Sequence, residues 1–396
     1  MKYELLAPVG NFSMLHSAID AGADAVYLGL DEFTMRQGAK NFSIRNLAKI
    51  QTICKSKNVS VFLTLNAIVY DTEIKRMEDV IKKVKNKIDA IICWDPAVIG
   101  LCNKYEIPFH ISTQASISNQ ETSEFYKKLG AQRVILAREL SLKQIKKTAK
   151  NNFVECFAHG AMCVAISGRC FMSQFTHNSS ANKGICAHPC RRAWTITDNE
   201  NNQLKLENSR VMSAKDLCTL PFIEKMKSAG IKSFKIEGRN RSSEYVSTVV
   251  RIYRRALDNK LSTKEILEGI SELKKVYNRG FSSGFYIRPP TSDDFSFTEN
   301  GEQEEYKQFT GRVEKYWQKA GSATVRIMAG NLKTGDEIYL ISKGQAIKRV
   351  TISTMEIDGK PLNKCKKGEL VGIKLPKCSK GTDVYLIKRK ALIQER

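Results

Sequence analysis

The sequence has no long uninterrupted hydrophobic run, and this absence excludes a helix that crosses a membrane. The longest apolar stretch, residues 59–70, contains polar residues such as Ser60 and Asn66, whereas a spanning helix needs about 20 consecutive apolar residues. The first residues also lack the apolar core of a secretory signal, because Glu4 and Pro8 interrupt them. We therefore predict a cytoplasmic protein that does not associate with a membrane.

Motifs of several common enzyme classes are missing as well. The chain has no G-x-G-x-x-G or P-loop for a nucleotide cofactor and no H-E-x-x-H for a zinc peptidase. It has only five histidines. One of them, His159, could be the base for a cysteine nucleophile, because Cys163 follows it by four residues. These absences argue against dinucleotide chemistry and leave a peptidase as an alternative function.

Acidic residues are scarce relative to basic ones. The 396 residues include 64 Lys and Arg but only 41 Asp and Glu, which gives a net charge of +23 and an isoelectric point near 9.5. A chain this basic favours a polyanionic partner, because each cation that meets a phosphate releases a counterion. Nucleic acid is therefore the partner that the charge favours, although a lysine-rich proteome would give the same excess without a partner.

What is present is a regular alternation of short apolar runs with amphipathic segments of helical length. Strands are predicted at 3–9, 23–30, 59–68, 88–94, 108–114, 133–137, 153–158 and 231–236, and helices between them, including one at 217–229. Eight such units in a row predict a (β/α)8 barrel of the TIM type over residues 1–286. A doubly wound parallel sheet is the alternative.

The pattern changes after residue 286. Residues 287–305 are polar and contain proline, which predicts a linker. Short alternating strands then return and predict a small β-barrel over residues 306–396. From Glu305 to the end there are 20 Lys and Arg against 9 Asp and Glu, a net +11. A small barrel with this charge is typical of nucleic-acid binding, with a solvated lysine-rich surface as the alternative.

Polar residues follow the predicted barrel strands at their carboxyl ends, where active sites of such barrels lie. They are Asn66, Trp94, Asp95, Gln114, Arg138, Glu139, His159, Glu237 and Arg239. Any one of them has a simpler explanation as a helix cap or a loop ion pair. Their convergence on one end of a barrel nevertheless predicts a polar site at its mouth, built from exposed side chains.

The segment 155–194 is rich in cysteine and contains the pattern C-x6-C-x15-C-x3-C, formed by Cys163, Cys170, Cys186 and Cys190. These cysteines stand among Gly, Ser, His and Arg rather than in an apolar face, which favours metal ligation over burial. A [4Fe–4S] cluster tolerates this spacing, whereas zinc prefers paired short knuckles, and unligated thiols remain open. Cys218 is a reserve ligand that we expect to be buried in the helix predicted at 217–229.

Longer motifs in the chain resemble those of the collagenase-like peptidases, family U32. The resemblance covers essentially the whole chain and is specific. Its motifs are Leu6-Ala7-Pro8-Val9-Gly10, Gly22-Ala23-Asp24-Ala25-Val26-Tyr27-Leu28-Gly29, Ser112-Thr113-Gln114-Ala115, Glu155-x-Phe157-x-His159-Gly160-Ala161-Met162-Cys163, Ser167-Gly168-Arg169-Cys170-x-Met172-Ser173, Gly184-x-Cys186-x3-Cys190-Arg191, Ser213-Ala214-Lys215-Asp216-Leu217 and Lys235-Ile236-Glu237-Gly238-Arg239.

The resemblance implies an iron–sulfur protein that supports oxygen-independent hydroxylation. Branches of the family act on a wobble uridine of transfer RNA, giving 5-hydroxyuridine with prephenate implicated, on a cytidine of 23S ribosomal RNA, or on ubiquinone precursors. By resemblance, the four cysteines of the C-x6-C-x15-C-x3-C pattern match the cluster ligands. The spacing and the C-terminal domain place the chain closer to the RNA branches than to the quinone branch.

These expectations give the site residues provisional roles. Arg36, Arg138 and Arg239 are predicted to hold a dicarboxylate such as prephenate, with Asn66 and Gln114 as further substrate-binding residues. The predicted acid/base groups are Glu139, His159 and Glu237. A target base must be turned out of its stack to reach such a site. The alternatives to this RNA hydroxylation enzyme are a peptidase and a non-catalytic RNA-binding factor.

Overall fold

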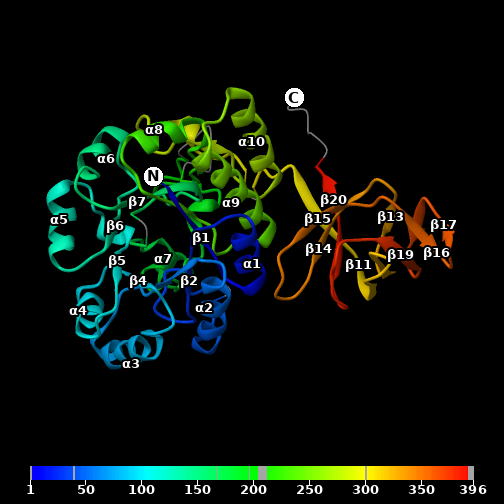
Figure 1. The fold of residues 1–396 in the computed structure, drawn as a ribbon. Coiled ribbons are helices and arrows are strands. Elements are labelled where there is room, and N and C mark those ends of the chain that lie inside the picture. The colour runs from blue at the N-terminus through cyan, green and yellow to red at the C-terminus, as the bar shows by residue number, and fades with distance from the viewer. Residues whose placement is uncertain are drawn as a thin grey trace.

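The computed structural model describes residues 2–38, 41–166, 168–195, 197–203, 212–298 and 301–390. Figure 1 shows a barrel surrounded by helices, with a second, all-β body to one side of it. The two bodies touch through helices α1 (Phe12–Asp20) and α9 (Ser243–Asp258) of the barrel domain. The backbone N–H of Ile347 donates to Ser17 Oγ (3.2 Å), and Lys307 Nζ donates to Glu244 Oε1 (2.5 Å).

The barrel domain contains a closed ring of eight parallel strands among the described residues. The ring runs in chain order from β1 to β7 and closes through β9, which pairs with both β7 and β1. The (β/α)8 prediction is therefore confirmed. Its strands are β1 (Glu4–Pro8), β2 (Ala25–Gly29), β3 (Ser60–Thr64), β4 (Ala90–Cys93), β5 (Phe109–Ile111), β6 (Arg133–Ile135), β7 (Val154–Gly160) and β9 (Ser233–Ile236).

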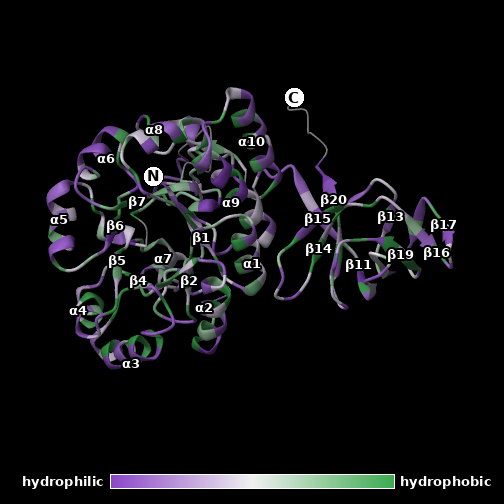
Figure 2. Cartoon of the chain, in the orientation of Figure 1, coloured by the Kyte–Doolittle hydropathy of each residue, from purple (hydrophilic) through white to green (hydrophobic). Residues whose placement is uncertain are grey.

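The helices cover the outside of the ring with one apolar face each. In α3, for example, the buried residues are Met77, Val80, Ile81 and Val84, a spacing of three and four that gives one stripe along a helix. Both hydrophobic and hydrophilic residues are visible on these helices (Figure 2). The helices are α1 (Phe12–Asp20), α2 (Leu47–Lys55), α3 (Ile74–Val84), α4 (Pro96–Lys104), α5 (Gln120–Lys128), α6 (Leu142–Thr148), α8 (Ile223–Ser228), α9 (Ser243–Asp258) and α10 (Thr263–Lys275).

The helix predicted at 217–229 is wrong in its first part. Residues Asp216–Cys218 form strand β8, which runs antiparallel to β7, and the α-helix begins only at Ile223. A 3-10 helix, Leu220–Phe222, comes first, and Phe222 leaves the helical region at φ −133° and ψ 26°, so the α-helix starts only after it. Strand β8 pairs on its other side with β10 (Phe281–Ser282).

The described part of the predicted linker lies against the barrel domain. Lys215 N donates to the Asp294 carbonyl (2.8 Å), and Ser296 N donates to the Ser213 carbonyl (2.7 Å). Asp294 and Ser296 are both buried. The exact boundary between the two domains stays a prediction.

The C-terminal domain is an antiparallel sheet that curls around its own hydrophobic core. Its long first strand, β11, pairs with both β12 and β20. Register shifts in both pairings allow β11 to bend, so that the sheet can curl. Its core includes Val313, Val325 and Ile338. The strands are β11 (Glu305–Trp317), β12 (Ser322–Ile327), β14 (Glu337–Ile341), β15 (Lys348–Thr351), β16 (Met355–Ile357), β17 (Lys360–Pro361), β19 (Leu370–Lys374) and β20 (Asp383–Arg389), with β13 (Asn331–Lys333) and β18 (Lys364–Lys366) as a separate pair.

Within the described ranges, no helix is long and apolar enough to cross a membrane.

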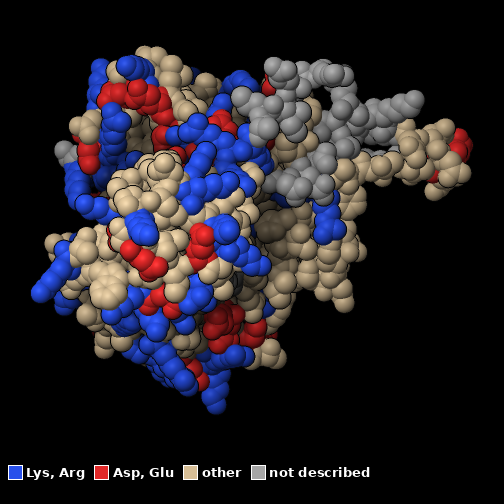
Figure 3. Space-filling view, turned by 90° about the vertical axis from the view of Figure 1, so that its right-hand side faces the viewer, with Lys and Arg blue, Asp and Glu red and all other residues tan. Residues whose placement is uncertain are grey.

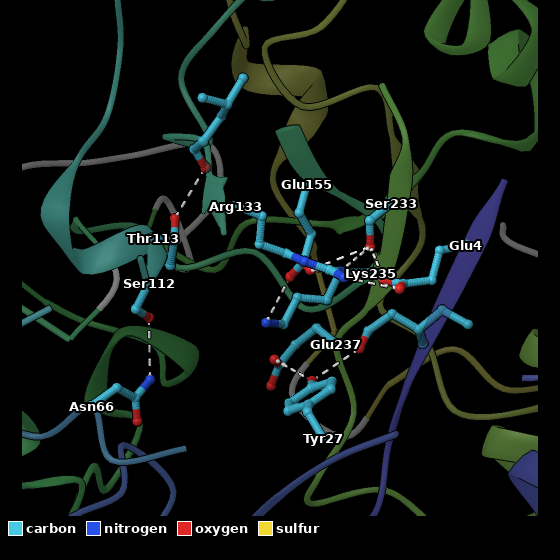
Figure 4. A network of polar contacts seen from close by, with 12 residues as sticks. Glu4, Tyr27, Asn66, Ser112, Thr113, Arg133, Glu155, Ser233, Lys235 and Glu237 are labelled. Atoms are coloured by element: carbon cyan, nitrogen blue, oxygen red, sulfur yellow. Dashed lines mark hydrogen bonds and ion pairs between the residues drawn. The ribbon is translucent and has the colours of Figure 1, made fainter. Parts of the chain in front are cut away.

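A buried network of charges fills the barrel interior (Figure 4). Lys235 Nζ donates to Glu155 Oε1 (3.0 Å), and Arg133 Nη1 donates to Glu155 Oε2 (3.2 Å). Burial opposes the ionisation of Glu155, but Lys235 and Arg133 outweigh it and lower the pKa of this carboxyl. The network holds Lys235 at the floor of the cavity described next.

Candidate functional site

A cavity of about 80 Å³, called here the inner chamber, opens at the carboxyl ends of the barrel strands. Its position is the one that parallel strands dictate, since their last residues all point to the same end of the ring. All five predicted substrate-binding residues meet there. Seven residues named from the sequence line the inner chamber: Arg36, Asn66, Gln114, Arg138, Cys163, Glu237 and Arg239.

The inner chamber is strongly cationic. Four of its lining side chains, Arg36, Arg138, Lys235 and Arg239, carry positive charge, against one carboxylate, Glu237. Arg36 Nη2 lies 3.1 Å from Glu237 Oε1, and Lys235 Nζ lies 3.0 Å from Glu155 Oε1. Two of the four positive charges are therefore paired. The excess of positive charge suits an anion with more than one carboxylate or phosphate group.

Glu237 is held in its ionised form. Tyr27 donates a hydrogen bond from its hydroxyl to Glu237 Oε2 (3.2 Å), as Figure 4 shows. Burial raises the pKa of this carboxyl, but Arg36, Arg138 and Arg239 outweigh burial and lower the pKa to about 2. At neutral pH Glu237 therefore accepts hydrogen bonds and does not donate a proton.

This arrangement predicts how Glu237→Gln changes stability with pH. The ionised carboxylate stabilises the folded state above its ordinary pKa of 4.5, and that contribution disappears as the pH falls toward 2. The difference between the two pKa values corresponds to about 3 kcal/mol. In parallel urea unfolding experiments we expect the variant to be less stable than the parent by this amount at pH 7 and nearly equal to it at pH 2.

Glu139→Gln is the matched control, because Glu139 is exposed in the turn after β6. It should change stability little at either pH. An equal loss for Glu237→Gln at both pH values would show that the carboxylate charge is not what stabilises the mouth.

Of two arginines that the sequence placed at an exposed mouth, Arg239 is buried and Arg138 is half-buried. Arg239 is only 4% exposed and donates from Nη1 to Thr64 Oγ1 (3.1 Å). Gly29 leaves room for it, because a Cβ there would lie 2.0 Å from Arg239 Nη1. Arg138 lies over the Phe157 ring at 3.8 Å and donates to the Ala161 carbonyl (2.9 Å).

Burial has a cost for these cations. It lowers the pKa of Arg239 to about 10 and also lowers the pKa of Arg138. The expectation that the mouth is built from exposed side chains is wrong for Arg239. Arg239→Ala would remove the hydrogen bond to Thr64 and leave a buried space, so it should reduce stability as well as any activity.

His159 does not reach the inner chamber. The strand pairing between β7 and β9 skips a residue between Phe157 and His159, and this bulge breaks the alternation that would put both side chains on one face. Phe157 lines the chamber, while His159 lies against Tyr245 and Tyr253 of α9.

The environment of His159 is that of a buried neutral ring. The side chain is 1% exposed, and its Nδ1 lies 3.3 Å from the Tyr253 hydroxyl. Burial lowers the pKa of His159 to about 3. The expected exposure of His159 is therefore wrong. Glu139, the other predicted acid/base group outside the chamber, is exposed. It lines none of the cavities described.

Two amides hold one wall of the inner chamber. Asn66 Nδ2 donates to Ser112 Oγ (3.3 Å), and Asn66 Oδ1 accepts from the backbone N–H of Met35 (3.2 Å). Gln114 Nε2 donates to the Asn66 carbonyl (3.4 Å). These bonds connect three barrel loops, so the two amides are positioned by the fold before any ligand arrives.

Sequence reasoning missed Lys235 and Tyr27 as lining residues. A signal for Lys235 was available. Lys235, Glu237 and Arg239 follow one another at intervals of two, and side chains at that spacing point to the same face of a strand. Tyr27 carried no such signal, since it lies within an apolar strand that reads as core.

A second, smaller cavity of about 50 Å³ collects the four predicted metal ligands, and it is called here the cysteine cavity. Cys163, Cys170, Cys186 and Cys190 all line it, although they come from separate segments after β7, around helix α7 (Met172–His177). Cys163 also lines the inner chamber. Ser167, which belongs to the same motif, lies outside the described residues.

The loop that carries these cysteines is tied together by hydrogen bonds. Ser173 Oγ lies 3.8 Å from Cys186 Sγ and accepts from Ala187 N (3.1 Å). Cys170 N donates to Asn182 Oδ1 (3.1 Å), and Arg191 Nη1 donates to the Ala214 carbonyl (2.8 Å).

The donor set consists of thiols only and surrounds a space. In the described part of the chain, no three His, Cys, Asp or Glu side chains converge on a position for a single metal ion. A single zinc ion needs four ligands arranged tetrahedrally around one position. Four thiols spread around a cavity fit a larger cluster of metal and sulfide better.

Cys218 is not part of this group. It lies on strand β8 rather than on a helix, is 4% exposed, and accepts from the Tyr253 hydroxyl at 3.8 Å. It does not line the cysteine cavity.

A third cavity, of about 270 Å³ and called here the outer chamber, adjoins the other two. It shares Arg36, Cys163 and Glu237 with the inner chamber and Cys163, Cys186 and Cys190 with the cysteine cavity. The three cavities together form one site at the mouth of the barrel.

Comparison with known proteins identifies the family of the chain. Residues 10–295 match the model of Peptidase family U32. A protein of Porphyromonas gingivalis named "Collagenase" is 38% identical over 391 residues, which cover 94% of each chain. A Bacillus subtilis protein named "tRNA hydroxylation protein P1" is 34% identical over 351 residues, covering 85% of this chain and 83% of the relative.

A further relative, from Escherichia coli, is named as a 5-hydroxycytidine synthase of 23S rRNA. It is 35% identical over 297 residues, which cover 74% of this chain but only 44% of that protein. The match of the family model over most of the barrel domain, together with these long alignments, shows that the chain belongs to peptidase family U32.

Proposed function

We propose that this protein is an iron–sulfur enzyme that hydroxylates a pyrimidine base of RNA without molecular oxygen. The favoured target is a wobble uridine of transfer RNA, converted to 5-hydroxyuridine. One observation carries the proposal: Cys163 lines both the cysteine cavity and the cationic inner chamber, so a cofactor and an anionic reactant would share a wall.

Cys163, Cys170, Cys186 and Cys190 would hold a [4Fe–4S] cluster, with zinc as the alternative metal. Such a cluster supplies one-electron transfer when it is bound. Arg36 lines the same cavity as the four thiols. A cation at this place would offset part of the negative charge of a thiolate-bound cluster.

The inner chamber would bind the oxygen donor, a hydroxylated dicarboxylate of the prephenate type. Arg36, Arg138 and Arg239 offer guanidinium groups for its carboxylates. The reaction balances if the C–H bond of the base becomes C–OH, with loss of two electrons, while the C–OH bond of the donor becomes C–H and gains the same two. Glu237, ionised, would orient Arg36 and accept a hydrogen bond from the donor hydroxyl.

RNA as the substrate is supported by charge and by relatives. Lys and Arg side chains are spread over the face that Figure 3 shows, with Asp and Glu between them. Two of the relatives carry names that state hydroxylation of tRNA or synthesis of a hydroxylated rRNA nucleoside.

A peptidase is the second candidate, because another relative is named "Collagenase". A cysteine peptidase would need a base beside its thiol. The Nδ1 of His159 contacts the Tyr253 hydroxyl, and His159 does not line the chamber that contains Cys163. The geometry therefore supports hydroxylation better than a Cys163–His159 pair.

The deciding experiment is nucleoside mass spectrometry of transfer and ribosomal RNA from a strain that lacks this gene. We expect one hydroxylated pyrimidine to disappear and to return with the parent gene or with Cys54→Ala, but not with Cys170→Ala. Unchanged nucleosides would contradict the proposal, and hydrolysis of collagen peptides by metal-free protein would then favour the peptidase.

A further inference from the structure

The outer chamber is large enough for a ligand that the inner chamber excludes. Its volume of about 270 Å³ compares with about 80 Å³ for the inner chamber. Small-molecule sites start at roughly 300 Å³, so the outer chamber approaches that size while the inner chamber suits only a compact reactant. Two cavities of different size that share Arg36 and Cys163 point to two reactants rather than one.

The charge of the outer chamber selects an anion. It is lined by four arginines, Arg36, Arg191, Arg241 and Arg279. Arg36 pairs with Glu237 and Arg279 with Asp216, which leaves an excess of two positive charges.

Arg279 has an unused donor at this chamber. The residue is 5% exposed, and its Nη2 lies 2.6 Å from Asp216 Oδ1. Its Nε is buried and has no hydrogen-bond partner among the residues that the structure describes. A buried N–H without an acceptor is costly, so the described residues do not satisfy all the hydrogen-bonding capacity of Arg279.

Arg241 and Tyr277 form a flat platform on another side of the chamber. The guanidinium carbon of Arg241 lies 3.7 Å from the centre of the Tyr277 ring, and both residues line the cavity. In the described part of the chain Arg241 takes part in no ion pair, so its charge is not neutralised. Guanidinium planes and aromatic rings are the surfaces on which unpaired RNA bases stack.

We propose that the outer chamber binds the target nucleotide of the RNA as a pyrimidine nucleoside monophosphate unit. Its phosphate is bound by Arg279 and Arg241, and its base stacks on the Arg241–Tyr277 platform. The inner chamber is left to the small carboxylate. This inference rests on the proposed function and assigns the two reactants to separate, adjoining cavities.

The test uses full-length holoprotein and a fluorescent uridine trinucleotide, with binding measured by anisotropy. Arg241→Gln and Tyr277→Leu should each weaken binding about tenfold, as expected for loss of one stacking contact. Arg76→Gln is the matched control, because Arg76 is an exposed residue of α3 that lies outside the chamber, and it should bind as the parent does. The visible spectrum and melting temperature of each variant report that fold and cofactor are intact.

Competition identifies the part of the ligand that is bound. Uridine 5′-monophosphate should displace the trinucleotide at lower concentration than uridine or inorganic phosphate. Displacement by inorganic phosphate at the same concentration as by the nucleotide would overturn the assignment of a nucleotide site.

The outcome of this binding test can be distinguished from the outcome of the RNA nucleoside analysis. Normal binding by Arg241→Gln and Tyr277→Leu would overturn this inference even if the deletion strain lacks a hydroxylated nucleoside. Weakened binding with unchanged nucleosides in that strain would support the nucleotide site and contradict the hydroxylation.

Discussion

Protein purified without oxygen should contain about four iron atoms and four sulfides per chain, as one [4Fe–4S] cluster requires. Replacing any one of Cys163, Cys170, Cys186 or Cys190 with Ala should remove the iron and the broad absorbance near 400 nm. The physical reason is that all four thiols line one cavity and no other thiol lines it. Iron analysis and visible spectra of the four variants measure the effect.

Two other cysteines provide controls in the same chain. Cys54 is fully buried on α2, where burial raises the pKa of its thiol to about 12, so it is a poor ligand. Cys218 lies on β8 beside Tyr253. Cys54→Ala and Cys218→Ala should both keep the iron. Loss of iron from Cys218→Ala would make Cys218 a ligand, and stoichiometric zinc in place of iron would contradict the cluster.

Removing three positive charges from the C-terminal domain should weaken binding of transfer RNA by roughly a hundredfold at 0.15 M salt, if all three meet phosphates. The three residues are Lys364, Lys366 and Lys367, which are exposed on and after strand β18. Changing them together to Gln should also reduce the slope of log affinity against log salt by about three, because each lost contact releases one counterion fewer. A salt series of filter-binding or anisotropy measurements gives both numbers.

An equal change on the barrel domain tests whether the position matters. Helix α6 carries three exposed lysines and lies on the side of the barrel away from the C-terminal domain (Figure 1). Changing Lys143, Lys146 and Lys147 to Gln removes the same charge and should leave the slope nearly unchanged. Equal losses in both triple variants would mean that net charge alone attracts RNA, and no loss in either would leave the C-terminal domain without a role in RNA binding.

The barrel could be predicted from the sequence because its signals are local and repeated. Each strand is a short apolar run, and each helix carries an apolar stripe with a spacing of three and four, as in α3. The helix start predicted at residue 217 is wrong because Asp216–Cys218 pairs as a strand with β7 and β10. These partners lie far away in the chain, so the pairing leaves no local signal in the sequence.

Which residues line the inner chamber could also largely be predicted from the sequence. Residues that follow parallel strands must come together at one end of a barrel, which is why Asn66, Gln114, Arg138, Glu237 and Arg239 line one cavity. The alternation along a strand adds Lys235 to this set, since it precedes Glu237 by two positions.

The sequence by itself therefore determined the fold class, the place of the site and the residues that could be grouped there. Only the tertiary structure decided which of those side chains face the cavity and how deeply they are buried. A single skipped residue in the β7–β9 pairing turns His159 toward α9, and packing covers Arg239 to 4% exposure. Both outcomes depend on contacts between segments far apart in the chain, so no local pattern of residues encodes them.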